Sequence, residues 1–171
     1  MTTFNISGLR AADFLGFEPL RSLPARSPAV PSVAGVYAVV LPSADHGLPE
    51  FLETSVGGHF KRKEPTVPID QLAATWVAEV ETLYIGSSVD LRRRLHEFAE
   101  FGRGKPIGHR GGRYLWQLVD HDRLLICWRA IENAEDPVDV ESDLLNELDD
   151  QHGSLPFANL RWPRRSPAVA A

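Results

Sequence analysis

Residues 82–95 read TLYIGSSVDLRRRL, and this stretch decides the fold. Its first four residues are β-branched, aromatic or apolar, which is typical of a short strand. Gly86 then allows a tight turn because it carries no Cβ. Ser87 lies three residues before Asp90, a capping-box-like pair that opens a helix. The stretch therefore predicts a strand, a turn and a helix in close succession.

The predicted helix has an apolar face and a basic face when its residues are placed at 100° intervals. The apolar face holds Leu91, Leu95 and Phe98. The basic face holds Arg92, Arg93 and His96. Arg94 lies at the margin of the apolar face, where a planar guanidinium in a fixed position suits a phosphate. The alternative is that Arg94 runs its stem along the core and places its charge in water.

Two further segments have the composition of strands. Residues 35–41 are compact and apolar, with Tyr37 on one side and Val36 and Ala38 on the other. Antiparallel pairing of residues 35–41 with the strand predicted at residues 82–85 places Tyr37 and Tyr84 on a common face. Two such tyrosines are usually half-buried core residues with a wet hydroxyl. Residues 124–131 form a continuous apolar run and predict a third strand.

An acidic helix is predicted from Pro137 to about Asp150, because proline suits the first position of a helix. Its apolar face is made by Val138, Leu144, Leu145 and Leu148. Glu141 lies at the centre of that face, and a lone carboxylate there is costly unless it is paired, hydrogen-bonded or bound to a cation. Glu141 is therefore a candidate functional residue. A buried ion pair with Arg94 is the structural alternative.

These residues together resemble the GIY-YIG nuclease family. The resemblance rests on Gly35-Val36-Tyr37, on Tyr84-Ile85-Gly86, and on Arg94 ten residues after Tyr84, and it covers about residues 33–160. It implies an α+β fold with a small three-stranded antiparallel sheet flanked by helices. Residues 33–171 are then one nuclease domain, and residues 1–32 are an N-terminal arm packed on it. Residues 42–80 are a long insertion between the first two strands.

The resemblance also implies catalytic roles. Glu141 holds a divalent metal, Mg²⁺ or Mn²⁺, which one carboxylate can do together with waters and substrate oxygens. Arg94 clamps the scissile phosphate, Tyr37 activates the attacking water, and Tyr84 orients the water or the phosphate. Asn159, in the segment Pro156-Phe157-Ala158-Asn159, positions the substrate.

Glu147 competes with Glu141 for the metal. It lies twelve residues before Asn159, a spacing that several relatives show between their metal-binding glutamate and a late asparagine. Glu147 projects to the polar side of the helix, however, whereas Glu141 is followed by leucines at the third and fourth positions. We therefore assign the metal to Glu141.

One position departs from the family. Four residues after the arginine, relatives usually carry a histidine or tyrosine, but here the residue is Phe98. His96 points to the opposite side of the helix from Arg94. His109, on the loop that follows, is the candidate replacement on sequence proximity alone. The alternative is that Phe98 marks reduced or lost activity.

Composition is that of a globular domain, with 43% hydrophobic and 24% charged residues in 171. A single cysteine, Cys127, excludes an internal disulfide and a cysteine-based zinc site. The N-terminus lacks the pattern of a signal peptide and no apolar run is long enough to span a membrane, so we expect a cytoplasmic protein.

The net charge of −5 conceals an uneven distribution. Residues 92–113 hold seven basic and two acidic residues, whereas residues 132–150 hold nine acidic residues and no basic one. A basic face beside an acidic helix fits a phosphate groove next to a metal site, although complementary surface patches give the same pattern. The predicted nucleic-acid contacts are Arg92, Arg93, Lys105, Arg110 and Arg113, with Lys61, Arg62 and Lys63 from the insertion.

The sequence thus predicts a metal-dependent endonuclease acting on DNA, with RNA a possible substrate. The alternative is a weakened or inactive module that binds nucleic acid without cutting it, which Phe98 favours. A small-molecule enzyme has no supporting motif. Cleavage of both strands by a single site requires a dimer or two binding events, and the sequence does not decide between them.

Overall fold

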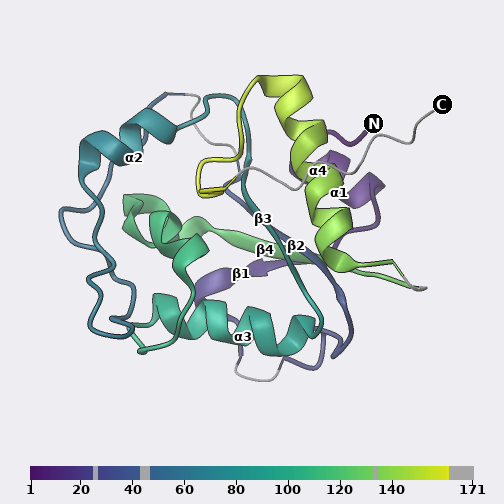
Figure 1. Ribbon diagram of the computed structural model, residues 1–171, viewed down its shortest axis with the longest axis horizontal. Helices are drawn as coiled ribbons and strands as arrows, with labels where there is room; N and C mark the ends of the chain where they lie inside the picture. Colours follow the sequence, from purple (N-terminus) through teal and green to yellow (C-terminus); the bar gives the residue numbers. More distant parts are fainter. Residues whose placement is uncertain (25–26, 43–46, 133–134, 162–171) are drawn as a thin grey trace.

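The fold is described from a computed structural model covering residues 1–24, 27–42, 47–132 and 135–161, excluding the side chains of Arg110 and Gly111. One sheet runs through its centre, with helices on both faces (Figure 1). The strands are β1 (Leu15–Pro19), β2 (Gly35–Val40), β3 (Thr82–Ser88) and β4 (Leu125–Ala130). Their order is β1-β4-β2-β3, and all neighbours are antiparallel.

The α+β class is confirmed, but the prediction of three strands is wrong. The fourth strand, β1, comes from the N-terminal segment and pairs with β4 at one edge of the sheet. Its register shifts between Gly16 and Glu18, and both Gly16 and Phe17 have positive φ. Such a bulge breaks the alternation of apolar and polar residues by which a strand is found in a sequence. The predicted strands at residues 35–41, 82–85 and 124–131 correspond to β2, β3 and β4.

Residues 82–95 fold differently from the prediction at two points. No turn occurs at Gly86, because β3 continues through it to Ser88. The helix α3 (Leu91–Gly102) is capped by Asp90, whose side chain accepts a hydrogen bond from the Arg93 amide. Ser87 is thus a strand residue rather than a cap. The sequence correctly predicted a side-chain cap at the start of the helix, but the cap is Asp90, three residues after Ser87.

The alternation along β2 separates two cores. Tyr37 and Val39 face one core, shared with α3, with α2 (Ile69–Thr75) and with the 3₁₀ segment Arg110–Gln117. Val36, Ala38 and Val40 face the other core, shared with α1 (Ile6–Ala11) and α4 (Pro137–His152). Figure 1 shows α3 and α4 on opposite sides of the strands. Because β3 is an edge strand, residues of both helices can meet beside it.

The insertion between β2 and β3 is tied to the domain by one buried side chain. The Gln117 carbonyl oxygen accepts from the Val67 amide at 2.8 Å, and its amide nitrogen donates to the carbonyls of Leu52 and Val67 at 3.0 and 2.8 Å. Phe51 adds a β-bridge to Leu118. The insertion also contains α2, which ends at Thr75. No helix in the described residues is both long and apolar enough to span a membrane.

Candidate active site

Two phenols pack together on the α3 side of the sheet. Tyr37 pairs with Gly86 across the β2–β3 ladder, and its ring centroid lies 6.0 Å from that of Tyr84. A Cβ on Gly86 would lie 2.6 Å from Cζ of Tyr37 and 3.0 Å from a ring carbon of Tyr84. Gly86 is therefore needed because the rings approach its backbone closely, and not because it makes a turn.

The two phenols differ in accessibility. Tyr37 is 1% exposed, whereas Tyr84 is 9% exposed and lines a cleft of about 490 Å³. Burial raises the pKa of the Tyr37 hydroxyl, and the neighbouring Arg94 and Tyr84 only partly oppose this shift. Burial raises the pKa of Tyr84 well above its ordinary value, and Tyr37 and Glu141 add to the effect. Both phenols are therefore protonated at neutral pH.

Arg94 reaches the same cleft from α3. Its side chain is 28% exposed and donates to Glu97 at 3.4 Å, one turn along the helix. Burial alone lowers the pKa of Arg94, but the adjacent phenols of Tyr37 and Tyr84 and the Glu97 carboxylate more than offset it and raise the pKa overall. Arg94 is thus a permanently charged guanidinium. Because it is partly buried and lines the cleft, its charge is only partly hydrated.

Glu141 reaches the cleft from α4, on the other side of the sheet. Its carboxylate accepts a hydrogen bond from the Ser87 hydroxyl at the end of β3. Burial raises the pKa of Glu141, while Ser87 and the charge of Arg94 pull it back. The structure therefore brings Tyr84, Arg94 and Glu141 to one cleft, with Tyr37 directly behind Tyr84.

Glu147 is directed elsewhere. Its carboxylate accepts a hydrogen bond from the Thr2 amide and lies 3.9 Å from the amino group of Met1. It therefore ties the N-terminus to α4, as Figure 1 shows by the start of the chain beside this helix. Of the two competing glutamates, only Glu141 lines the cleft.

His109 lies against the hidden side of the phenols. Its Nδ1 accepts a hydrogen bond from the Gly112 amide at 3.1 Å, so the ring proton is on Nε2. Nε2 lies 3.4 Å from the Tyr37 hydroxyl oxygen. Burial, assisted by the charge of Arg94, lowers the pKa of His109 well below its ordinary value. The imidazole is therefore neutral and donates a hydrogen bond to Tyr37.

Phe98 is the support for this histidine. The rings of Phe98 and His109 are stacked with centroids 3.9 Å apart and an interplanar angle of 3°. Phe98 also contacts Tyr37 and Tyr84 edge-on, at 6.2 and 5.8 Å. A Cβ on Gly112 would collide with the Phe98 ring, so the loop that carries His109 needs a glycine there. The residue that departs from the family thus positions an imidazole beside the phenols.

Asn159 lines the cleft, but its side chain is already engaged. Its oxygen accepts from the Ile85 amide at 2.9 Å and its nitrogen donates to the Ile85 carbonyl at 2.8 Å. The amide thereby substitutes for a neighbouring strand along the open edge of β3. This geometry gives Asn159 a structural function at the cleft wall and leaves its predicted contact with substrate without support.

The predicted nucleic-acid contacts have different environments. The Arg92 side chain donates to the Val30 carbonyl at 2.7 Å and so holds the N-terminal segment, and Arg93 pairs with Glu97 at 3.2 Å. Lys105 is exposed, and the side chain of Arg110 lies outside the described part of the structure. Arg113 lines the cleft beside Tyr84 and Glu141.

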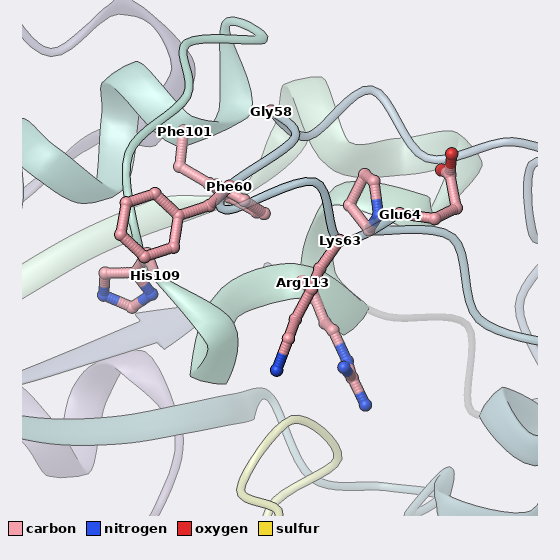
Figure 2. A pocket seen from close by; sticks show the side chains of 8 residues that line it. Gly58, Phe60, Lys63, Glu64, Phe101, His109 and Arg113 are labelled. Carbon is pink, nitrogen blue, oxygen red and sulfur yellow. The ribbon is translucent and has the colours of Figure 1, made fainter.

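The basic tip of the insertion lies near Arg113. Lys61 and Arg62 are exposed and both have positive φ, in a tight turn closed by a bridge between Phe60 and Lys63. Figure 2 shows Lys63 and Arg113 extending in the same direction from a small hollow of about 40 Å³ that Phe60, Phe101 and His109 also line. Two cations from distant segments therefore stand together near the site.

The residues present accommodate one magnesium-like cation only with help from substrate. Within the described ranges, no group of three or more histidine, cysteine, aspartate or glutamate side chains could hold a metal. Glu141 supplies a single half-buried carboxylate, and Mg²⁺ commonly binds through one or two carboxylates plus phosphate oxygens and waters. The donor set fits such an ion and does not fit a tightly held zinc.

Sequence reasoning missed Ser87 as a partner of Glu141, because the strand was ended too early. With β3 extended to Ser88, alternation places Ser87 on the same side as Ile85, which faces the α4 core. Arg161, which also lines the cleft, had no sequence signal. No family model, curated protein or solved structure matches this chain. The resemblance to GIY-YIG nucleases therefore rests on the motifs alone.

Proposed function

We propose that this chain is a metal-dependent endonuclease of the GIY-YIG type that hydrolyses phosphodiester bonds in DNA in the cytoplasm. The observation that supports it most is one cleft holding a phenol, a partly buried guanidinium and a half-buried carboxylate, from β3, α3 and α4. These groups come from segments far apart in the chain, and each is costly to bury alone.

In this proposal Arg94 binds the scissile phosphate and offsets the negative charge that grows on it. Glu141 would hold the divalent ion, which supplies Lewis-acid stabilisation of the phosphate and of the leaving oxygen. Ser87 orients the Glu141 carboxylate through its hydroxyl. Arg113 and Lys63, which extend in the same direction from one small hollow, bind neighbouring phosphates of the backbone.

The phenols handle the proton of the attacking water. Tyr84 lines the cleft and contacts the water, and Tyr37 packs behind it. With Tyr37 first ionised to its phenolate, Tyr84 takes the proton of the water and passes its own hydroxyl proton to Tyr37. This refines the roles that the sequence assigned, because Tyr37 itself is almost fully buried. A phenolate on Tyr37 is stabilised by Arg94 and by the Nε2–H of His109.

A plasmid-nicking assay tests the proposal. We expect the full chain to relax supercoiled DNA with Mg²⁺ or Mn²⁺, and Glu141→Gln to lower the nicking rate by about 100-fold or more. Glu147→Gln is the matched control, because it changes the same kind of group on the same helix outside the cleft. Equal loss in both variants, or an unchanged nicking rate in Glu141→Gln, contradicts the assignment. Parallel reactions with RNA define the range of substrates.

The second candidate function is a nucleic-acid-binding module without cleavage. The raised pKa values of both phenols favour it, because neither is a ready base at neutral pH. Binding of DNA in a mobility-shift assay, with no nicking at any pH or metal concentration, would support this function over the first.

A further inference from the structure

A second hollow adjoins the cleft that holds Glu141. It measures about 790 Å³ and lies between the end of α2 and the loop that follows α4. Arg113, Asn159 and Leu160 line both hollows, so they form a shared wall. A chain molecule with one group in the first hollow can therefore place its next group in the second. We call the second hollow the α2 groove.

The α2 groove has an aromatic wall. Trp76 is partly exposed and packs edge-on against Phe157, with centroids 5.2 Å apart. Phe157 in turn lies 5.7 Å from Tyr114. Because Phe157 and Tyr114 are almost fully buried, Trp76 contributes the accessible aromatic surface. Leu160, which is 42% exposed, adds an apolar contact next to the cleft.

Polar groups of opposite kind stand in the same wall. The Gln71 amide nitrogen donates to the Tyr114 hydroxyl at 2.5 Å. This leaves the Gln71 carbonyl oxygen as an acceptor and the Tyr114 hydroxyl proton as a donor. A neighbouring acceptor and donor match the edge of a nucleobase, which alternates donors and acceptors.

Charge places the backbone of such a ligand. The Arg113 guanidinium carbon lies 5.6 Å from the centroid of the Tyr114 ring, between the α2 groove and the cleft. Arg113 lines both hollows, so a phosphate bound to it stands next to the groove that holds Trp76 and next to the cleft that holds Arg94. A base that is paired and stacked inside a duplex cannot enter such a hollow without leaving its partner.

We propose that the α2 groove binds an unpaired nucleobase next to the phosphodiester in the cleft. The substrate class is then nucleic acid with a single-stranded, bulged or flipped nucleotide beside the cut, rather than a continuous duplex. This inference rests on the proposed function for the position of the phosphate. It adds a requirement for base exposure, which metal-dependent cleavage alone does not contain.

Binding measurements test the inference without depending on cleavage. Fluorescence anisotropy of the full chain carrying Glu141→Gln would compare one labelled sequence as single strand, as perfect duplex and as duplex with one bulged nucleotide. We expect the single strand and the bulged duplex to bind at least about tenfold more tightly than the perfect duplex, given the strength of base–aromatic stacking. Trp76→Leu should remove most of this preference, and Trp76→Phe should keep it.

A second variant covers the case in which Trp76→Leu fails to fold. Ala74→Glu puts a carboxylate at an exposed position of the groove and should weaken binding of the bulged duplex. Leu15→Glu, at the opposite edge of the sheet, adds the same charge as a control and should leave binding unchanged.

The outcomes separate the two proposals. Equal affinity for all three nucleic acids, no binding to any of them, or equal weakening by the groove and control variants would overturn the inference. Cleavage of perfect duplex without preference would overturn it and leave the nuclease proposal standing. Selective binding of the bulged duplex without cleavage would support the groove and remove the nuclease proposal.

Discussion

The two edges of the sheet are protected in different ways. At the β1 edge, a bulge with positive φ at Gly16 and Phe17 distorts the strand, and Leu15 is 65% exposed to solvent. At the β3 edge, the Asn159 side chain takes both backbone groups of Ile85. Both devices prevent pairing with another chain. The second lies beside an open space, into which α3 and α4 bring Arg94 and Glu141.

Removing a charged group at each edge of the sheet should give the largest difference in nicking rate between the two edges. Arg94→Ala or Glu141→Gln should lower the nicking rate by about 100- to 1,000-fold, the range for loss of a group that stabilises transition-state charge. Glu18→Gln, on β1, should change the rate by less than about twofold. Single-turnover rates on plasmid DNA measure the difference. Comparable losses at both edges would remove the functional distinction between them.

The substitution Glu141→Gln, which should lower the nicking rate, should leave the stability of the fold unchanged or raise it. Its pKa is raised by burial, so the folded state binds the proton more tightly than the unfolded state does. The stability that the protonated group contributes is therefore lost as pH rises above the ordinary glutamate range. At neutral pH, Glu141→Gln should melt at or above the wild-type temperature in calorimetry, and a clear decrease would contradict this account.

The pH dependence of cleavage tests whether the phenols of Tyr37, on β2, and Tyr84, on β3, take up the proton. Because burial raises the pKa of Tyr37 and of Tyr84 above 10, less than about one phenol in a thousand is ionised at pH 7. The rate should therefore rise by about tenfold per pH unit from pH 6 to 9. Tyr37→Phe should flatten this profile. A wild-type rate that is independent of pH would exclude a phenol as the proton acceptor.

A pair of glycine substitutions separates damage to the site from damage to the fold. Gly86→Ala places a methyl group 2.6 Å from the Tyr37 ring, so it should displace the phenols and reduce cleavage by tenfold or more. Gly16→Ala collides with Trp128 at a φ of 90° and should destabilise the domain by about 1–3 kcal/mol.

The two variants are compared well below their melting temperatures. Under these conditions Gly16→Ala should keep more cleavage activity than Gly86→Ala, since its clash is with the Trp128 ring and with neither phenol. Cleavage by Gly86→Ala at the wild-type rate would show that the packing of the phenols is not needed for activity.

The smallest expected effect is that of Asn159→Ala. Loss of the two hydrogen bonds leaves the amide and carbonyl of Ile85 without their partner, which should cost about 1–3 kcal/mol in urea denaturation. Cleavage at low temperature should fall by less than about tenfold, because both polar groups of the side chain are already hydrogen-bonded to Ile85. A loss as large as that of Arg94→Ala would restore a direct role for Asn159.

Local sequence patterns predicted most of the strands and helices that surround the site. The alternation in residues 35–41 places Tyr37 opposite Val36 and Ala38, and the two cores divide in this way. The helical periodicity placed Arg94 at the margin of an apolar face, where the structure has it half-buried. β1 was missed because a bulge removes the alternation, and Ser87 was misassigned because two polar residues at a strand end look like a helix cap.

The sequence by itself determined the faces of the strands and helices, the shared side of Tyr37 and Tyr84, and the placing of Glu141 on a core-facing position. It could do so because these properties follow from the fixed periods of strand and helix. Only the tertiary structure decided that Glu141 meets Ser87, that Glu147 ties down the N-terminus, and that His109 stacks on Phe98 beside Tyr37. Each of those contacts joins residues that have no fixed spacing in the chain. Tertiary packing therefore sets their geometry, and the period of a strand or helix does not.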